Sequence, residues 1–224
     1  MLGDSINNSF PRKSIELDLG ENQDSELCRV ATIDIGTNST HLLIAKIEPN
    51  LNTFSIELAE KSTTRLGERD PSTGELTSLA MNRAFLTLKR FKDLSESYKV
   101  ESLIIAATSA VREAPNGGIF ISEIKKKIGL DVELISGAEE ARLIYLGVLS
   151  GMQFGNKPHL VLDIGGGSTE LILADSSEAR ALTSTKIGAV RLQREFIKKD
   201  PISPQNELFL RSFIRGSMES AIDK

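Results

Sequence analysis

The chain has 224 residues, of which 40% are hydrophobic and 26% charged, so it is long enough to bury a sizeable core in one large or two small domains. A formal net charge of −4 argues against a protein that binds a nucleic-acid duplex by neutralising its phosphates. The single cysteine, Cys28, excludes disulfides and a thiolate metal site, and no apolar run or signal-peptide pattern points to a membrane. We therefore expect a cytoplasmic protein without nucleic-acid or membrane partners.

The first predicted domain covers residues 28–152. Residues 1–27 before it are polar and lack apolar periodicity, which predicts a disordered tail. Within the domain, apolar patterns predict three strands and a long helix, at 30–35, 42–47, 54–59 and 78–98. Strands and helices then alternate, with strands at 103–107 and 132–135 and helices at 119–128 and 139–152.

A linker at 151–157 leads to a second predicted domain, residues 158–224. It begins with another hairpin at His159, continues with a third strand at 179–185, and ends in helices near 190–198 and 204–222. The order of elements predicts an α/β protein with mixed sheets flanked by helices.

A fifteen-residue pattern occurs twice. Residues 31–45 read ATIDIGTNSTHLLIA and residues 160–174 read LVLDIGGGSTELILA, with seven of fifteen positions identical. Each copy predicts a β-hairpin whose first strand ends in Asp and whose turn consists of small residues. Such a turn lets backbone N–H groups point at an anion, and the Asp can hold a cation beside it. Two copies predict a duplicated fold in which two phosphate loops face each other.

Further segments accompany the hairpins: ATSAVREA at 107–114, SGAEEAR at 136–142 and DIGGGSTE at 163–170. Taken in order, these segments resemble the exopolyphosphatase/guanosine pentaphosphate phosphohydrolase (Ppx/GppA) family of the actin-like ATPase superfamily, over residues 30–195. The resemblance implies a duplicated actin-like (ribonuclease H-like) fold. It also implies Mg²⁺-dependent hydrolysis of the terminal phosphoanhydride of inorganic polyphosphate or, alternatively, of guanosine pentaphosphate.

Family members continue beyond the point where this sequence stops. We therefore expect the second domain to be partial, with sheet edges that either a homodimer or a missing C-terminal part covers.

Glu139 and Glu140 open the predicted helix at 139–152. Ser136 and Glu139 have the spacing of a capping box, which explains Glu139. The Glu140 side chain points about 100° further round the helix, where it is either a solvated first-turn acid or a residue facing the cleft. The resemblance places the family's catalytic carboxylate at Glu140, where it orients or deprotonates the attacking water.

Arg112 follows a buried strand and is the second expected catalytic residue. A surface arginine is the plain alternative, but the family carries a phosphate-binding arginine at this position, and a planar guanidinium matches phosphoryl oxygens. Asp163 ends a strand that we expect to be buried, where an unpaired carboxylate is costly. It either caps the turn or, as the resemblance implies, helps to place Mg²⁺, with Asp34 as its counterpart; direct ligation and ligation through water both stay open.

Both loops are expected to donate hydrogen bonds to phosphate oxygens, although a turn requiring positive φ also explains their glycines. The expected donors are Gly36, Asn38, Ser39, Gly165, Gly166, Gly167 and Ser168. The segment RLGE at 65–68 resembles the family's mobile loop at the cleft mouth, which makes Arg65 a candidate substrate contact. Arg191, in a segment that also resembles the family, is the best candidate for a track holding trailing phosphates, the alternative being a solvated basic face.

Two other functions stay open. One is an actin-like kinase that moves phosphate from ATP to a sugar or acid, which is disfavoured because the glycine-rich adenosine-site segment expected late in such chains is missing. The other is a non-catalytic phosphate-binding module that keeps the loops without turnover.

Overall fold

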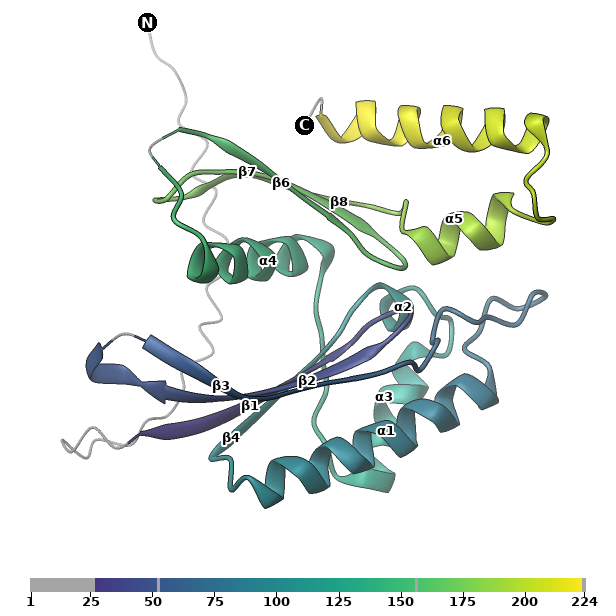
Figure 1. Ribbon diagram of the computed structural model, residues 1–224. Coiled ribbons are helices and arrows are strands. Elements are labelled where there is room, and N and C mark those ends of the chain that lie inside the picture. The colour runs from purple at the N-terminus through teal and green to yellow at the C-terminus, as the bar shows by residue number, and fades with distance from the viewer. Residues whose placement is uncertain (1–26, 52, 156, 223–224) are drawn as a thin grey trace, which may run out of the picture.

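Two β-sheets and their helices make up residues 27–51, 53–155 and 157–222, the part of the chain that the computed structural model describes. The sheets form separate layers with α4 (Gly137–Gly151) between them (Figure 1). Apart from Leu27, the tail predicted for residues 1–27 lies outside the described residues. In the described ranges, no helix is both long and apolar enough to cross a membrane.

The first sheet has five strands in the order β3-β2-β1-β4-β5. Their bounds are Cys28–Ile35 for β1, Thr40–Glu48 for β2, Thr53–Ser62 for β3, Ser102–Ala107 for β4 and Glu133–Leu134 for β5. β1 pairs with β2 in antiparallel and with β4 in parallel orientation, so the sheet is mixed, as predicted. The parallel pairing brings the end of β4, and with it the segment that carries Arg112, beside the end of β1.

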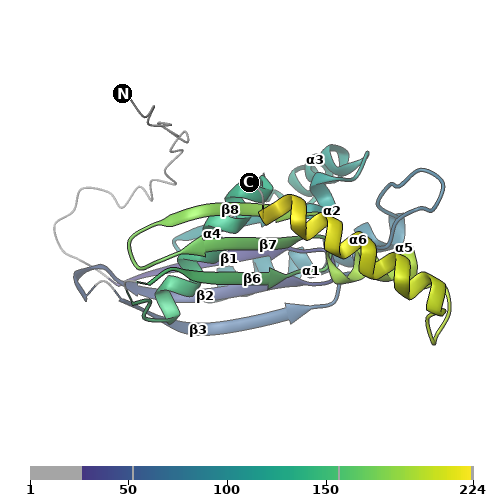
Figure 2. The same cartoon turned by 90° about the horizontal axis from the view of Figure 1, so that it is seen from above.

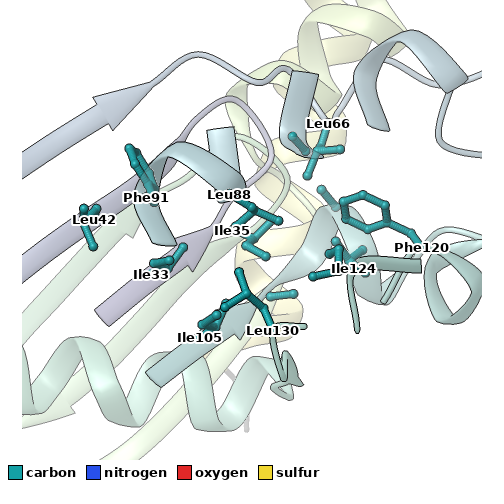
Figure 3. Packing of buried hydrophobic residues seen from close by; sticks show 14 of the residues in the cluster. Ile33, Ile35, Leu42, Leu66, Leu88, Phe91, Ile105, Phe120, Ile124 and Leu130 are labelled. Carbon is teal, nitrogen blue, oxygen red and sulfur yellow. The ribbon is translucent and has the colours of Figure 1, made fainter. Parts of the chain in front are cut away.

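The main hydrophobic core lies between this sheet and two helices, α1 (Ser78–Ser97) and α3 (Gly117–Ile128). A short helix, α2 (Ser109–Arg112), and a 3-10 turn at Pro49–Leu51 were not predicted from the sequence. α3 ends at Gly129, whose φ of +77° favours glycine because it lacks a Cβ. Buried side chains of the core include Ile33, Ile35, Leu42, Leu88, Phe91, Ile105, Phe120 and Ile124 (Figure 3).

The buried face of α1 combines small and large apolar residues. Leu79 and Leu86 are 66% and 72% exposed, whereas Ala80, Ala84 and Leu88 are fully buried. The buried residues are spaced four apart and so lie on one stripe of the helix, where the small alanines allow close approach to the sheet. The buried face also includes Phe91, which is fully buried, so small and large side chains share it.

The second sheet has three antiparallel strands in the order β6-β7-β8. They are β6 (His159–Ile164), β7 (Thr169–Ala174) and β8 (Ala179–Thr185). Contrary to the prediction, β6 is largely exposed and so is Asp163. This exposure follows from the position of β6 at the edge of the described sheet. α5 (Ala189–Phe196) and α6 (Pro204–Ile222) follow β8, and α6 lies over the outer side of this sheet (Figure 2).

α4 packs on the second sheet. Ala141 and Tyr145 share a small core with Ile172 and Ala174, and the Tyr145 hydroxyl donates to the carbonyl of Asp175 at 3.0 Å. The domain boundary after residue 152 stays a prediction. Although α4 precedes that boundary, its apolar face packs on the second sheet, and the sheet together with α4, α5 and α6 is called here the second unit.

The two hairpins have the same register. Asp34 lies opposite His41 in the first and Asp163 lies opposite Glu170 in the second. The chain thus builds the same strand–turn–strand unit twice, as the repeat predicted.

Candidate active site

The turns of the two hairpins meet each other. The hydroxyl of Thr37, in the first turn, lies 3.1 Å from the Ser109 hydroxyl at the start of α2. Gly167 of the second turn fits against both, because a Cβ at Gly167 would lie 2.0 Å from Ser109 Oγ and 2.6 Å from Thr37 Oγ1. The predicted facing of the loops is therefore observed, and at this point they touch.

The turn glycines differ from the expectation in two ways. The Gly36 N–H donates to the Ser39 carbonyl at 3.1 Å, and the Gly165 N–H donates to the Ser168 carbonyl at 3.0 Å, so these two amides close the turns themselves. Among the described glycines, only Gly74 and Gly129 have positive φ, so the prediction of a positive φ in these turns was wrong. Close approach of backbone and side chains, rather than a left-handed conformation, explains Gly167.

The second loop is held by α5. The carbonyls of Gly165 and Gly166 accept the N–H groups of Ala189 and Val190, both at 2.9 Å. These bonds satisfy amides of the first helical turn, which have no partner within the helix. They also fix the position of the loop relative to Arg191, which is part of the same turn.

The segment that contains Arg65 is attached to the first loop by its main chain. The Arg65 N–H donates to the Asn38 carbonyl at 2.9 Å, and the Gly67 N–H donates to the Thr37 carbonyl at 2.8 Å. Arg65 has a φ of +51°, which is strained for a residue with a Cβ. Its side chain is 64% exposed, with Glu68 at 3.8 Å. Arg65 therefore stands beside the first loop with a guanidinium open to solvent.

Arg112 and Glu140 form an ion pair between the end of α2 and the first turn of α4. Arg112 Nη1 donates to Glu140 Oε2 at 3.2 Å and to the Ile135 carbonyl at 2.8 Å. The two side chains are only 23% and 17% exposed. Residues 28 positions apart are thus brought together on the side of α4 that faces the loops.

The neighbouring Glu139 has a different role. Its N–H donates to the Ser136 hydroxyl at 3.1 Å, which confirms the predicted cap. Its carboxylate binds Arg142 through two hydrogen bonds, at 2.7 and 2.8 Å, instead of reaching back along the helix. Of the two adjacent glutamates, Glu140 is therefore the one that reaches Arg112.

The surroundings raise the pKa of Glu140 to about 7. Burial is the largest cause, and the negative charge of Glu170 adds to it, while Arg112 opposes the shift. A carboxyl that titrates near neutral pH takes up and releases protons readily under physiological conditions, which suits a general base.

Three carboxyl groups influence one another where the hairpins meet. Burial is the main cause that raises the pKa values of Asp34 and Glu170, and the charge of Asp163 raises both further. Asp34 keeps exposed surface although the surrounding protein desolvates its carboxylate, and Asp163 is also exposed. Glu170, by contrast, is 1% exposed and accepts a hydrogen bond from Ser184 Oγ at 2.7 Å. The two predicted metal ligands are therefore electrostatically coupled across the two hairpins.

This donor set fits Mg²⁺ bound together with substrate. In the described ranges, no three or more His, Cys, Asp or Glu side chains gather as a complete metal site. Mg²⁺ is commonly held by one or two carboxylates, with water and substrate phosphate completing its shell. Asp34 and Asp163 supply that number of carboxylates.

The place where the two hairpin turns meet is called here the junction. Several polar groups at this junction were not predicted from the sequence. They are Thr37, Ser109, Glu113 and Glu170. A signal for Glu170 was present, because it occupies the position of His41 in the repeat. The side chain of His41 is hydrogen-bonded to Ser39, with Nε2 2.8 Å from the hydroxyl oxygen.

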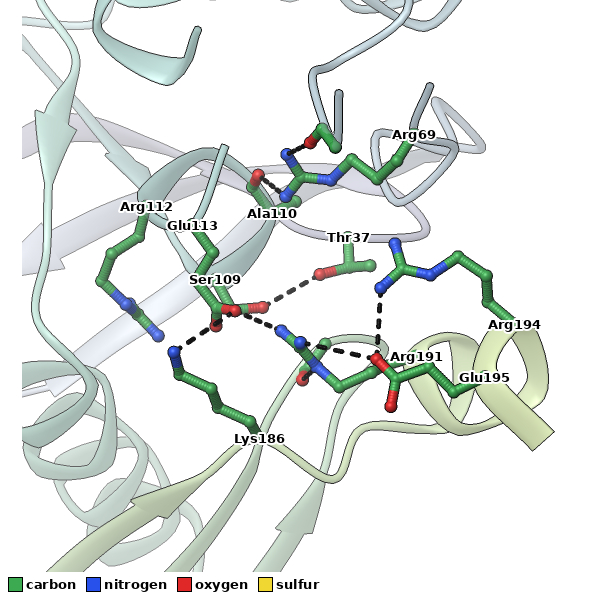
Figure 4. Close-up of polar contacts among 12 residues, drawn as sticks. Thr37, Arg69, Ser109, Ala110, Arg112, Glu113, Lys186, Arg191, Arg194 and Glu195 are labelled. Atoms are coloured by element: carbon green, nitrogen blue, oxygen red, sulfur yellow. Dashed lines mark hydrogen bonds and ion pairs between the residues drawn. The ribbon is translucent and has the colours of Figure 1, made fainter. Parts of the chain in front are cut away.

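Two pockets flank the junction. The first, of about 900 Å³, is lined by Arg112, Gly137, Ser168 and Ser184 among others, and is called here the Arg112 pocket. The second, of about 720 Å³, is lined by Thr37, Gly167, Arg69, Arg191 and further basic residues, and is called the Arg191 pocket. Figure 4 shows polar side chains from the lining of the two pockets.

The chain is similar to proteins that are named for two different activities. It is 34% identical over 203 residues to Exopolyphosphatase 2 of Mycobacterium tuberculosis, covering 88% of this chain and 63% of that protein. It is 36% identical over 177 residues to guanosine-5'-triphosphate,3'-diphosphate pyrophosphatase of Photobacterium profundum, covering 79% of this chain and 35% of that protein.

A solved structure agrees with these relatives. The crystal structure of an exopolyphosphatase from Cytophaga hutchinsonii has a TM-score of 0.81 and 36% identity, over 87% of this chain and 63% of that one. The duplicated, actin-like α/β fold implied by the resemblance is confirmed. This chain spans less than two thirds of the length of these relatives. Since the model of the Ppx/GppA phosphatase family matches residues 43–224, the chain belongs to that family.

Proposed function

We propose that this chain carries the site of a Mg²⁺-dependent phosphoanhydride hydrolase that removes the terminal phosphate of inorganic polyphosphate in the cytoplasm. The observation that carries the proposal is the partly buried pair of Arg112 and Glu140 beside the two touching loops, with the pKa of Glu140 raised to about 7. The family and its exopolyphosphatase relatives support the same reading.

Each side chain has a distinct task in this proposal. Glu140 accepts a proton from the attacking water, and Arg112 turns its guanidinium from Glu140 to the phosphoryl oxygens as negative charge develops there. Asp34 and Asp163 would hold Mg²⁺, which when bound would neutralise part of the charge on the phosphate oxygens.

The loops position the end of the substrate. Ser39, Asn38 and Ser168 offer hydroxyl and amide groups, and the N–H groups of Gly166 and Gly167 lie in the second turn. Because Gly36 and Gly165 use their amides within the turns, we assign them to shaping the loops.

Guanosine pentaphosphate is the alternative substrate. The Photobacterium profundum relative is named for a guanosine nucleotide of this kind. Both substrates present a chain of phosphates with a terminal anhydride, and the groups at Arg112 and Glu140 act only on that end.

The test is phosphate release from both substrates in the presence of Mg²⁺, measured for the intact chain and two variants. Glu140→Gln is expected to lose at least about 100-fold in rate, because a general base is removed. Glu139→Gln is the matched control, since it alters the adjacent carboxylate, which binds Arg142, and it is expected to keep its rate. Equal rates for the intact chain and Glu140→Gln would show that the assignment of Glu140 is wrong. Binding of polyphosphate without phosphate release by the intact chain would point instead to the non-catalytic module.

A further inference from the structure

Glu113 stands between the two pockets. It follows Arg112 directly, at the C-terminal end of α2, and it lines both the Arg112 pocket and the Arg191 pocket. Its side chain is only 17% exposed. Glu113 is therefore the residue that the site proposed for hydrolysis shares with the neighbouring basic pocket.

The partners of Glu113 come from the second unit. Arg191 Nη2 donates to Glu113 Oε2, and Lys186 Nζ lies 3.8 Å from the same oxygen (Figure 4). Arg191 also donates from Nε to the Gly167 carbonyl at 3.0 Å, so its guanidinium is fixed against the second loop. The Glu113–Arg191 pair thus links α2 to α5 beside the place where the loops touch.

Several cationic side chains line the Arg191 pocket beside this pair. The Arg191 pocket is lined by four cationic side chains and three carboxylates, one of which is Glu113. Arg69 is bound to the carbonyls of Ala110 and Gly74, and its pKa is lowered by burial and then by the nearby charge of Arg194, whereas Glu113 raises it. Glu113 therefore offsets part of the repulsion among these guanidinium groups. The pocket residues with positive charge are Arg69, Arg191, Arg194 and Lys198.

We propose that Glu113 is a gate carboxylate that determines how strongly the chain favours long polyphosphate over short phosphate chains. This inference rests on the proposed function. Glu113 neutralises Arg191 while no substrate is bound, and it repels an anion that passes between the pockets. A phosphate chain with its end beside Arg112 and Glu140 reaches the basic pocket only by displacing Glu113 from Arg191. Long chains gain contacts there, whereas tripolyphosphate is too short to use them.

Glu113→Gln tests the gate because it keeps the shape of the side chain and removes its charge. We expect affinity for long polyphosphate to rise on the order of fivefold when this one repelling charge is removed, with little change for tripolyphosphate. The gain is expected to shrink at high salt because counterions screen the interaction. Affinity is measured by fluorescence anisotropy of end-labelled polyphosphate on the full chain, with unlabelled tripolyphosphate as competitor.

Glu195→Gln is the matched control. Glu195 lines the Arg191 pocket and lies 3.9 Å from Arg191 Nη1, but it does not line the Arg112 pocket. Glu195→Gln also removes one negative charge beside Arg191, but it leaves the residue shared by the two pockets unchanged, so no comparable length-dependent gain is expected. Equal gains for Glu113→Gln and Glu195→Gln, an equal gain for both phosphate lengths, or no gain with Glu113→Gln would overturn the gate.

Arg191→Gln decides the question if Glu113→Gln does not fold. It leaves the gate carboxylate without this partner, so affinity for long polyphosphate is expected to fall more than affinity for tripolyphosphate. An equal loss for both lengths, or absence of polyphosphate binding in the intact chain, would contradict the inference. Because these measurements need no turnover, a failure of the catalytic role of Glu140 stays distinguishable from a failure of the gate.

Discussion

Glu140 illustrates how a single residue acquires its chemistry from its surroundings. Its neighbour Glu139 has the same side chain, yet pairing with Arg142 lowers the pKa of Glu139, whereas burial raises that of Glu140. One carboxylate stays ionised at the helix surface, and the other titrates near neutral pH beside Arg112. The difference between an ordinary first-turn acid and a proposed general base is therefore one of burial and partner.

The rate of hydrolysis is expected to depend on pH through Glu140. Because the pKa of Glu140 in the substrate-free chain is raised to about 7 and the base form is the unprotonated one, kcat/KM should rise about tenfold per pH unit below 7 and level off above it. The measurement is kcat/KM against pH with polyphosphate for the intact chain and for Glu139→Gln, whose profile should coincide with it. A flat profile between about pH 5.5 and 8.5 is the result that contradicts this role.

The same shift affects stability with a defined sign. The pKa of Glu140 is raised from 4.5, its ordinary value, so the folded chain binds a proton that the unfolded chain has already lost. The contribution of Glu140 to the free energy of unfolding is fully present below pH 4.5 and is lost as the pH rises through about 7. Ionised Glu140 therefore destabilises the fold at alkaline pH, a cost that suits a functional rather than a structural residue.

At the scale of elements, the strand–turn–strand unit positions the site. Both turns are closed by the same hydrogen bond, from the glycine after the Asp-Ile pair to the serine three residues on. The turns then meet α2 and α5 through small groups, because Gly167 leaves space that the Ser109 and Thr37 hydroxyls occupy. Small side chains in these turns thus serve contact between units as much as contact with phosphate.

Gly167→Ala is expected to separate the loops. Its Cβ would lie 2.0 Å from Ser109 Oγ, so the neighbours must move, with a loss of about 1–3 kcal/mol in stability and a fall in phosphate release. Gly147→Ala is the control, since nothing lies within 4 Å of its Cβ in α4, and it should stabilise the helix by about 1 kcal/mol. Both free energies of unfolding are measured by urea denaturation. A Gly167→Ala chain as stable and active as the parent would show that the loops need not touch.

At the scale of the whole molecule, the site belongs to neither sheet alone. Arg112 and Glu113 come after β4 of the five-stranded sheet, whereas Gly167 and Arg191 belong to the second unit. The helix α4 carries Glu140 between the two layers (Figure 1).

The two units also differ at one edge of their sheets. β1 has β4 as a parallel neighbour, whereas β6 lies at the edge of the described second sheet with Leu160, Leu162 and Ile164 exposed.

Binding between the units should stabilise the whole chain. A ligand that binds only the folded state adds about 2.7 kcal/mol at 100 times its Kd, so saturating polyphosphate with Mg²⁺ is expected to raise Tm. The measurement is thermal unfolding with polyphosphate and, separately, with ATP, which should give no comparable shift. A larger shift with ATP would instead support the actin-like kinase.

Short-range sequence patterns determined the local structure. Apolar alternation and turn residues predicted β1 to β3 and β6 to β8 closely, and β8 and α6 begin and end at the predicted residues. Those elements depend on interactions between residues near in sequence, which a pattern records. α2 was missed because a four-residue helix has too little periodicity to detect. The candidate residues Arg112, Glu140 and Asp163 came from the family resemblance together with their place at the ends of strands and helices.

Only the tertiary structure decided how those residues meet. Arg112 pairs with Glu140, 28 positions away, and Thr37 contacts Ser109, 72 positions away. Glu113 lines two pockets that are formed by residues of both units. Burial, and with it the raised pKa of Glu140, depends on the packing of α4 between the sheets rather than on any local pattern. The reason is physical: sequence neighbours determine backbone conformation, but desolvation and charge pairing are properties of the packed chain.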